Sequence, residues 1–143
     1  MIALLHNGFI WSPLLAWAVG QVLKVVTESV RMHQLSLRPL GSSGGMPSSH
    51  TAMTVCLTTR LARLLGTASP VFATAAVLTI VVVYDATGVR RAAGQQALVL
   101  NRVLDDLRQH MGLRHERVLE LLGHTPVEVL AGIALGVAIG MLV

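Results

Sequence analysis

Four apolar blocks divide the chain, and they limit its fold more than any other feature of the sequence. They cover residues 9–30, 50–65, 71–84 and 124–143, with polar segments between them. A backbone that crosses a bilayer must satisfy its hydrogen bonds internally, so each block is expected to be a helix, even the β-branched block 71–84. The two middle blocks are short for a span, which predicts tilted helices or a locally thinned bilayer.

The composition also indicates a membrane protein. Of the 143 residues, 53% are hydrophobic and only 13% are charged, whereas soluble domains carry roughly a quarter charged residues. We therefore expect an all-α fold, an integral membrane bundle of about four transmembrane helices forming a single domain over residues 1–143. The net charge of +4 suits anionic lipid or phosphate, and aromatic residues at 3% leave no stacking platforms for nucleic acid, which we exclude as a partner.

A polar excursion, residues 85–123, separates the third block from the fourth. Apolar residues recur at three- to four-residue intervals over 89–111, which predicts an amphipathic helix on the membrane surface. Gly112 is expected to interrupt this helix, and a shorter helix is expected over 116–122. Asp85, at the start of the excursion, is expected to cap a helix or to pair with Arg90.

Four spans bring the unusual polar residues of the chain to one membrane face. The end of the first span, the start of the second, the end of the third and the start of the fourth all lie on the same side. The residues at these positions are Lys24, His50, Arg90 with Arg91, and His124. Ionisable residues are costly inside a membrane, so this convergence predicts a functional site.

Residues 44–50, Gly-Gly-Met-Pro-Ser-Ser-His, have the features of an anion-binding segment. The two glycines allow close approach of the backbone to a ligand, and Pro47 suits the first turn of a helix. Ser48 and Ser49 place hydroxyls beside the unpaired amides of a helix N-terminus, which is a favourable position for an anion. His50 then supplies a proton donor or a nucleophile next to that anion.

A second histidine is expected to have a carboxylate beside it. His124 and Glu128 are four residues apart on a helix expected to begin at about Gly123, so their side chains should lie one above the other. Glu128 can then accept the imidazole proton and fix its tautomer. One histidine can attack phosphorus while the other protonates the leaving alcohol. The remaining histidines show no spacing typical of metal ligands, so no metal is expected.

Three segments resemble the motifs of the PAP2 family, the type 2 phosphatidic acid phosphatases related to vanadium haloperoxidases. Lys24 and Arg31 resemble Lys-x6-Arg-Pro, but Met32 replaces the proline. Residues 47–50 resemble Pro-Ser-Gly-His, with Ser49 in place of glycine. His124 and Glu128 resemble the end of Ser-Arg-x5-His-x3-Asp, with glutamate in place of aspartate. The arginine of this third motif has no match at its place before His124, which leaves Arg90 and Arg91 as candidates.

Longer segments, at residues 44–52, 84–97 and 121–132, look like the divergent PAP2 branch, so the resemblance covers nearly the whole chain. It implies a membrane phosphatase that hydrolyses a lipid phosphate or pyrophosphate without a metal or other cofactor. His124 would be the nucleophile and His50 the acid, with Lys24, Ser48 and an arginine binding phosphate. The resemblance leaves two points open: whether Arg31 also binds phosphate, and whether the protein forms a homo-oligomer. The alternative is a non-catalytic membrane protein that binds phospholipid headgroups through a degenerate site.

The protein is expected in the inner (plasma) membrane of a bacterium, and the distribution of its arginines predicts that the site faces the cytoplasm. Basic residues in short loops concentrate on the cytoplasmic side of a membrane protein. The opposite end carries only Arg60 and Arg63. The end with the motifs carries Arg31, Arg38, Arg90, Arg91, Arg102, Arg108, Arg114 and Arg117.

Overall fold

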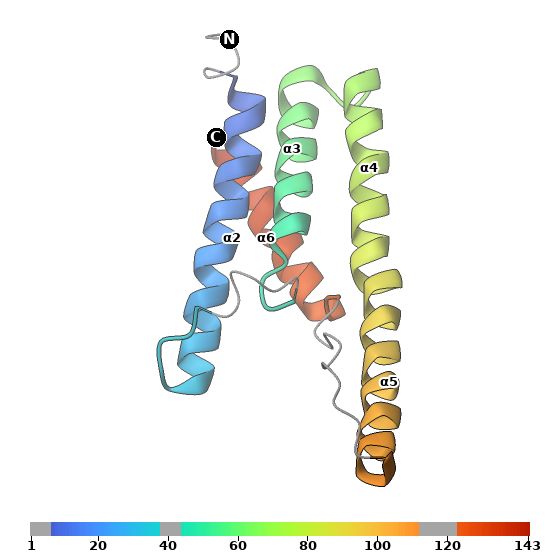
Figure 1. Cartoon of the computed structure of the whole chain (residues 1–143). Helices are drawn as coiled ribbons and strands as arrows, with labels where there is room; N and C mark the ends of the chain where they lie inside the picture. The colour runs from blue at the N-terminus through green and yellow to red at the C-terminus, as the bar shows by residue number, and fades with distance from the viewer. Residues whose placement is uncertain (1–6, 38–43, 112–122) are drawn as a thin grey trace.

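The computed structural model describes residues 7–37, 44–111 and 123–143, and all the regular structure in these ranges is helical (Figure 1). The predicted interruption at Gly112 and the predicted helix over 116–122 lie outside the described residues. The other predicted helices are present, with ends shifted by a few residues. They are α2 (Gly8–Met32), α3 (Ser49–Leu65), α4 (Pro70–Thr87), α5 (Val89–Met111) and α6 (Pro126–Leu142).

Side-chain caps fix where the apolar helices begin. Asn7, Ser48, Ser69 and Thr125 each accept a hydrogen bond from a backbone N–H in the first turn of the helix that follows. Such caps satisfy amides that the helix itself leaves unpaired. Because Ser48 is the cap of α3, Pro47 lies before the helix, and the prediction that Pro47 occupies its first turn is wrong.

Helix α3 is the centre of the bundle and packs against α2, α4 and α6. Its contact with α6 depends on three glycines at four-residue spacing, which form one stripe along α6. A Cβ atom at Gly132, Gly136 or Gly140 would lie 2.5, 2.6 or 2.8 Å from a carbonyl oxygen of α3 or its cap. Two helix backbones approach this closely only over small residues, as in membrane helix pairs.

The outer surfaces of the helices are suited to lipid. Large apolar residues are exposed along them, including Val30, Ile80 and Leu130. Two helical stretches are long and apolar enough to cross a membrane, Gly8–Met32 and the combined stretch Pro70–Asp106, while Pro126–Leu142 is a shorter apolar helix. These features confirm the prediction of an all-α membrane bundle.

The predicted amphipathic helix is present as α5, but it continues the direction of α4 (Figure 1) and does not turn aside to lie on the membrane surface as expected. The N–H of Gly88 donates to the carbonyl of Tyr84, 2.8 Å away, at the junction of the two helices. The third apolar helix therefore extends through Thr87, and the polar excursion begins three residues later than predicted. The C-terminal ends of α2 and α4 and the N-terminal ends of α3 and α6 lie at one end of the bundle, which we call the motif end.

Candidate active site

His124 is held at the motif end by its backbone and by its ring. Its N–H donates to the carbonyl of Ala86, 3.0 Å away, which attaches it to the last turns of α4. Its Nδ1 lies 3.0 Å from Oε2 of Glu128, and the residue is only 3% exposed. The predicted pairing of His124 with Glu128 is therefore confirmed.

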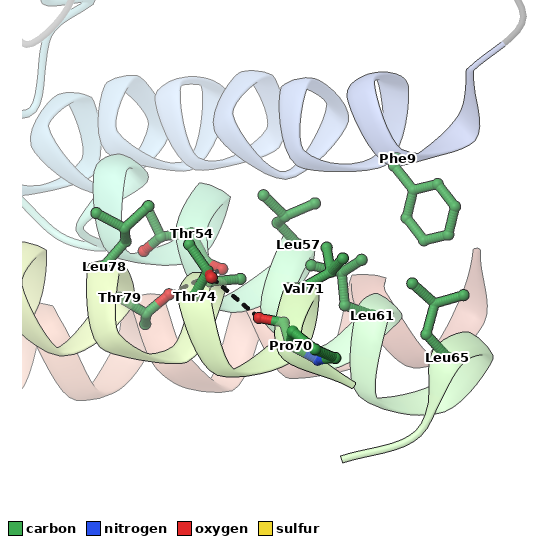
Figure 2. Close-up of a pocket in the computed structure, with 11 residues that line it drawn as sticks. Phe9, Thr54, Leu57, Leu61, Leu65, Pro70, Val71, Thr74, Leu78 and Thr79 are labelled. Carbon is green, nitrogen blue, oxygen red and sulfur yellow. Dashed lines mark hydrogen bonds between the residues drawn. The ribbon is translucent and has the colours of Figure 1, made fainter. Parts of the chain in front are cut away.

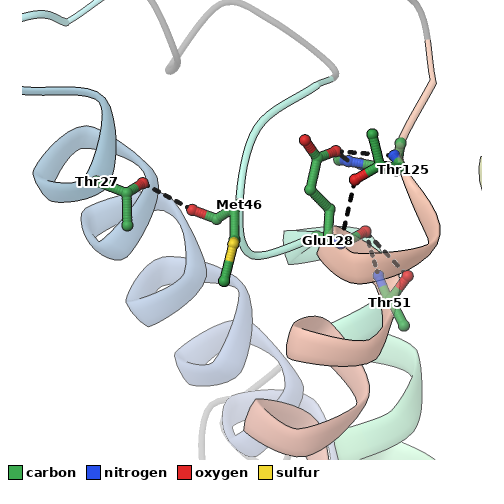
Figure 3. A network of polar contacts seen from close by, with 7 residues as sticks. Thr27, Met46, Thr51, Thr125 and Glu128 are labelled. Carbon is green, nitrogen blue, oxygen red and sulfur yellow. Dashed lines mark hydrogen bonds and ion pairs between the residues drawn. The ribbon is translucent and has the colours of Figure 1, made fainter. Parts of the chain in front are cut away.

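The route to this pairing differs from the prediction. Helix α6 begins at Pro126, so His124 precedes the helix and does not stack on Glu128 within it. Instead, Glu128 belongs to a capping box with Thr125 (Figure 3). Its Oε2 accepts from the Thr125 N–H at 3.1 Å, while its own N–H donates to Thr125 Oγ1 at 3.3 Å. The same carboxylate thus begins the helix and orients the imidazole.

His50 and His124 line one cavity of about 370 Å³ at the seam between α3 and α4. Asp85, from the end of α4, lines the same cavity. The other walls are mostly apolar, with Met53 on α3 and Val81 and Val82 on α4. The predicted convergence of the two histidines is confirmed. The sequence left Asp85 as a cap or an arginine partner, and its position directly after the apolar block 71–84 was the signal for a residue of this cavity.

Lys24 lies beside the loop that precedes α3. It is 2% exposed, and its Cδ is 3.7 Å from where a Cβ of Gly45 would be. Gly45 has a φ of 101°, which a residue with a side chain rarely adopts, so the loop can wrap around Lys24. Thr27 fixes this loop to α2 by donating to the carbonyl of Met46 at 2.8 Å (Figure 3). Lys24 interacts electrostatically with Glu128, so it belongs to the polar cluster around His124.

The two serines before His50 lie in different environments. Ser48 is fully buried, its Oγ lies 2.9 Å from Oγ1 of Thr51, and its N–H donates to the carbonyl of Glu128 at 2.9 Å. Ser49 instead packs between α2 and α3, with its Cβ 3.1 Å from where a Cβ of Gly20 would be. Its buried Oγ has no hydrogen-bond partner among the described residues. Gly20 therefore makes room for the serine that replaces the glycine of the family motif.

The arginines are not all placed by the structure. Arg31 is exposed in the last turn of α2, two turns beyond Lys24. Arg90 and Arg91 lie in the first turn of α5, and their side chains are outside the described ones. In the ranges that the structure describes, no group of three or more histidine, cysteine, aspartate or glutamate side chains is arranged to hold a metal.

The geometry around His124 fixes what its ring can do. When Nδ1 donates its proton to the Glu128 carboxylate, the lone pair of the neutral ring is on Nε2. A carboxylate that orients an imidazole in this way is the arrangement found in catalytic triads. His50, on another wall of the same cavity, is placed to give or take a proton.

Comparison with known proteins identifies the family of the chain. A family model described as the divergent PAP2 family matches residues 5–139. The chain is 36% identical over 140 residues to the uncharacterized membrane protein YuiD of Bacillus subtilis (strain 168). The matched region covers 90% of this chain and 89% of that protein. No solved structure matches the chain. The chain is a membrane protein that belongs to the divergent PAP2 family.

Proposed function

We propose that this protein is a membrane phosphatase that hydrolyses a lipid phosphate or pyrophosphate through a histidine nucleophile. One observation carries the proposal: His124, oriented by Glu128 at 3.0 Å, lines the same cavity as His50. The cavity lies at one end of a membrane bundle, and its walls are mostly apolar, which suits a phosphate attached to a lipid. The proposal that the reaction needs no metal rests on the family resemblance.

The two histidines divide the reaction between them. The Nε2 lone pair of His124 attacks phosphorus, the bond from phosphorus to the lipid oxygen breaks, and protonated His50 gives its proton to that oxygen. Water then attacks the phosphohistidine while neutral His50 takes a proton from it, and the phosphorus–nitrogen bond breaks. Inorganic phosphate leaves, His124 regains its lone pair, and His50 is again protonated.

The phosphate oxygens need donors around them during both steps. Lys24 supplies one positive charge beside Glu128, and the first amides of α3 follow the buried Ser48. An arginine from the start of α5, Arg90 or Arg91, would complete the set. Arg31 is the outermost candidate, because it is exposed two turns beyond Lys24.

One observation favours the alternative, a non-catalytic headgroup-binding protein. The Ser48 hydroxyl accepts from the N–H of Thr51 and lies 2.9 Å from Oγ1 of Thr51, so it is already used within the protein. Such a site would bind a lipid phosphate and release no product. Turnover therefore separates the two functions where binding does not.

Purified protein is expected to release inorganic phosphate from at least one member of a panel of lipid phosphates and pyrophosphates. Release should continue in excess EDTA, because no step uses a metal, and should fall with vanadate, which mimics the phosphoryl group in the cavity lined by His50 and His124. A colorimetric phosphate assay measures all three results. Loss of turnover on chelation, restored by a divalent ion, would contradict the metal-independent mechanism.

The motif end is proposed to face the cytoplasm, following the distribution of arginines. Two exposed positions test this: Gln34, after α2 at the motif end, and Ala68, between α3 and α4 at the other end. In a Cys56→Ala background, a membrane-impermeant thiol reagent should label Ala68→Cys in intact cells and label Gln34→Cys only after permeabilisation. Labelling of Gln34→Cys alone in intact cells would reverse the orientation.

A further inference from the structure

A second cavity lies along the same helix seam, farther from the motif end. Its volume is about 690 Å³, and it is lined by α3, α4 and Phe9 at the start of α2 (Figure 2). Helix α3 forms its floor through Leu57, Leu61 and Leu65, between Phe9 on one side and α4 on the other. We call this cavity the seam groove.

The seam groove is continuous with the candidate active site. Thr54 lines both cavities. On α3, the lining residues from His50 through Thr54 to Leu65 recur every three or four positions, so they form one stripe of the helix. On α4, Val71, Ala75, Leu78, Val82 and Ala86 form a matching stripe. The two stripes make a single seam from the histidines to the far end of the bundle.

The threonines of the groove have their hydroxyls hydrogen-bonded within the protein. Thr54, Thr74 and Thr79 each donate to a backbone carbonyl, those of His50, Pro70 and Thr54 respectively. Thr79 Oγ1 also lies 2.8 Å from Oγ1 of Thr58, which joins α3 to α4. Because their hydroxyls are satisfied by the protein, these threonines need no polar partner from an occupant. The lining is thus almost wholly apolar.

The apolar surface of the groove is not covered by the described part of the chain. Leu78, Val71 and Leu65 are 59%, 55% and 49% exposed. Within a bilayer, hydrocarbon covers such a surface. Because the groove is continuous with the cavity of His50 and His124, we expect this hydrocarbon to belong to a lipid whose phosphate lies in that cavity.

The length of the groove indicates how far that hydrocarbon extends. From Thr54 to Leu65 it runs roughly 16 Å along α3 at the helical rise per residue, and its far end is roughly 22 Å from the level of His50. One leaflet of a bilayer contributes only about 15 Å of hydrocarbon. A chain that fills the groove from a phosphate at His124 therefore passes the bilayer midplane.

We infer that the seam groove binds one hydrocarbon chain of the lipid phosphate substrate, and that it selects chains longer than a single leaflet. This inference rests on the proposed function, because the phosphate of the same lipid is placed at His50 and His124. It assigns substrate selection to Thr74 and Leu61 at the far end of the groove, where neither residue touches the phosphate.

A plug at the far end of the groove tests this inference. Thr74→Phe places a ring in the groove, while Val77→Phe adds the same bulk to an exposed position of α4 outside the groove lining. Thr74→Phe should lower kcat/KM for a long-chain lipid phosphate by at least about tenfold and leave the short-chain value within about twofold. Val77→Phe should change neither value. An equal loss on both substrates, or no loss on either, would overturn the inference.

Photo-crosslinking separates failure of the groove from failure of the proposed phosphatase. A long-chain lipid phosphate with a diazirine at the end of its chain should label residues 61–74, whether or not the protein hydrolyses it. Labelling confined to the outer face of α2 would overturn the assignment of the groove to the lipid chain, even if phosphate is released.

A disulfide test asks whether a second copy of the chain covers the groove instead. Leu65→Cys in a Cys56→Ala background should not form a disulfide between two copies. If the disulfide forms and added lipid does not lower its yield, a second copy of the chain covers the groove and the inference is overturned.

Discussion

Replacing His124 by alanine is expected to reduce phosphate release by on the order of 10⁴-fold or more, as removal of a nucleophile does in other enzymes. The reason is local, since the ring assigned as the nucleophile is the one that the Glu128 carboxylate holds at 3.0 Å. His50→Ala should cost roughly 10²–10⁴-fold, because it removes proton transfer and leaves the attacking nitrogen in place. Both losses should appear in kcat of the purified protein.

Two further variants make this result specific. Glu128→Gln keeps the capping box, which accepts glutamine, and removes only the charge that orients His124. It should therefore reduce kcat by less than His124→Ala. His33→Asn is the control, because His33 is exposed after α2 and asparagine tolerates its φ of 53°. Retained turnover in His124→Ala would remove the assigned nucleophile.

Gly136→Leu is expected to prevent α6 from packing on α3 and so to abolish the fold of the motif end. Even a Cβ at Gly136 would lie 2.6 Å from the carbonyl oxygen of Ala52 and 2.8 Å from Cβ of Val55. Both neighbours are on the helix wall and cannot move away without displacing α3. Overpacking by a few methyl groups costs about 1–3 kcal/mol in a well-packed core, and a full leucine against backbone should cost more.

The matched control for this substitution is Ala134→Leu, which adds a similar side chain to an exposed position of the same helix. The melting temperature in detergent and the monodisperse fraction on size exclusion should fall for Gly136→Leu and stay near the wild-type values for Ala134→Leu. If the melting temperature of Gly136→Leu equals that of the wild-type protein, the close contact between α3 and α6 does not stabilise the bundle.

The helices could be predicted from the sequence because a membrane leaves an apolar block few other structures. The β-branched block 71–84 is helical for this reason, against its local preference. The helix starts were less predictable, since they depend on which polar side chain reaches back to the first amides. Helix α6, for example, is capped by Thr125 and begins at Pro126 rather than at about Gly123. The four-residue spacing of the glycines at 132, 136 and 140 is a sequence signal for close helix packing, which the predictions above did not include.

The meeting of His50 with His124 could be predicted because consecutive spans alternate in direction, which places the starts of the second and fourth spans on one face. The neighbours of each side chain could not, because they depend on how the helices rotate against each other. Ser49 faces Gly20 of α2, whereas Ser48, one residue earlier, is joined to α6 through the Glu128 carbonyl. Lys24 interacts with Glu128 because α2 and α6 are neighbours, which no spacing within either helix reveals.

Trapping the phosphorylated protein tests the central claim most directly. A lipid phosphate labelled at phosphorus is mixed with the protein, the reaction is quenched in alkali on the millisecond scale, and the labelled peptide is sequenced. The histidine mechanism predicts an alkali-stable, acid-labile phosphate on His124, which forms before phosphate is released and is absent from His124→Ala. Turnover with no phosphohistidine at any quench time, or with the label on another residue, would contradict it.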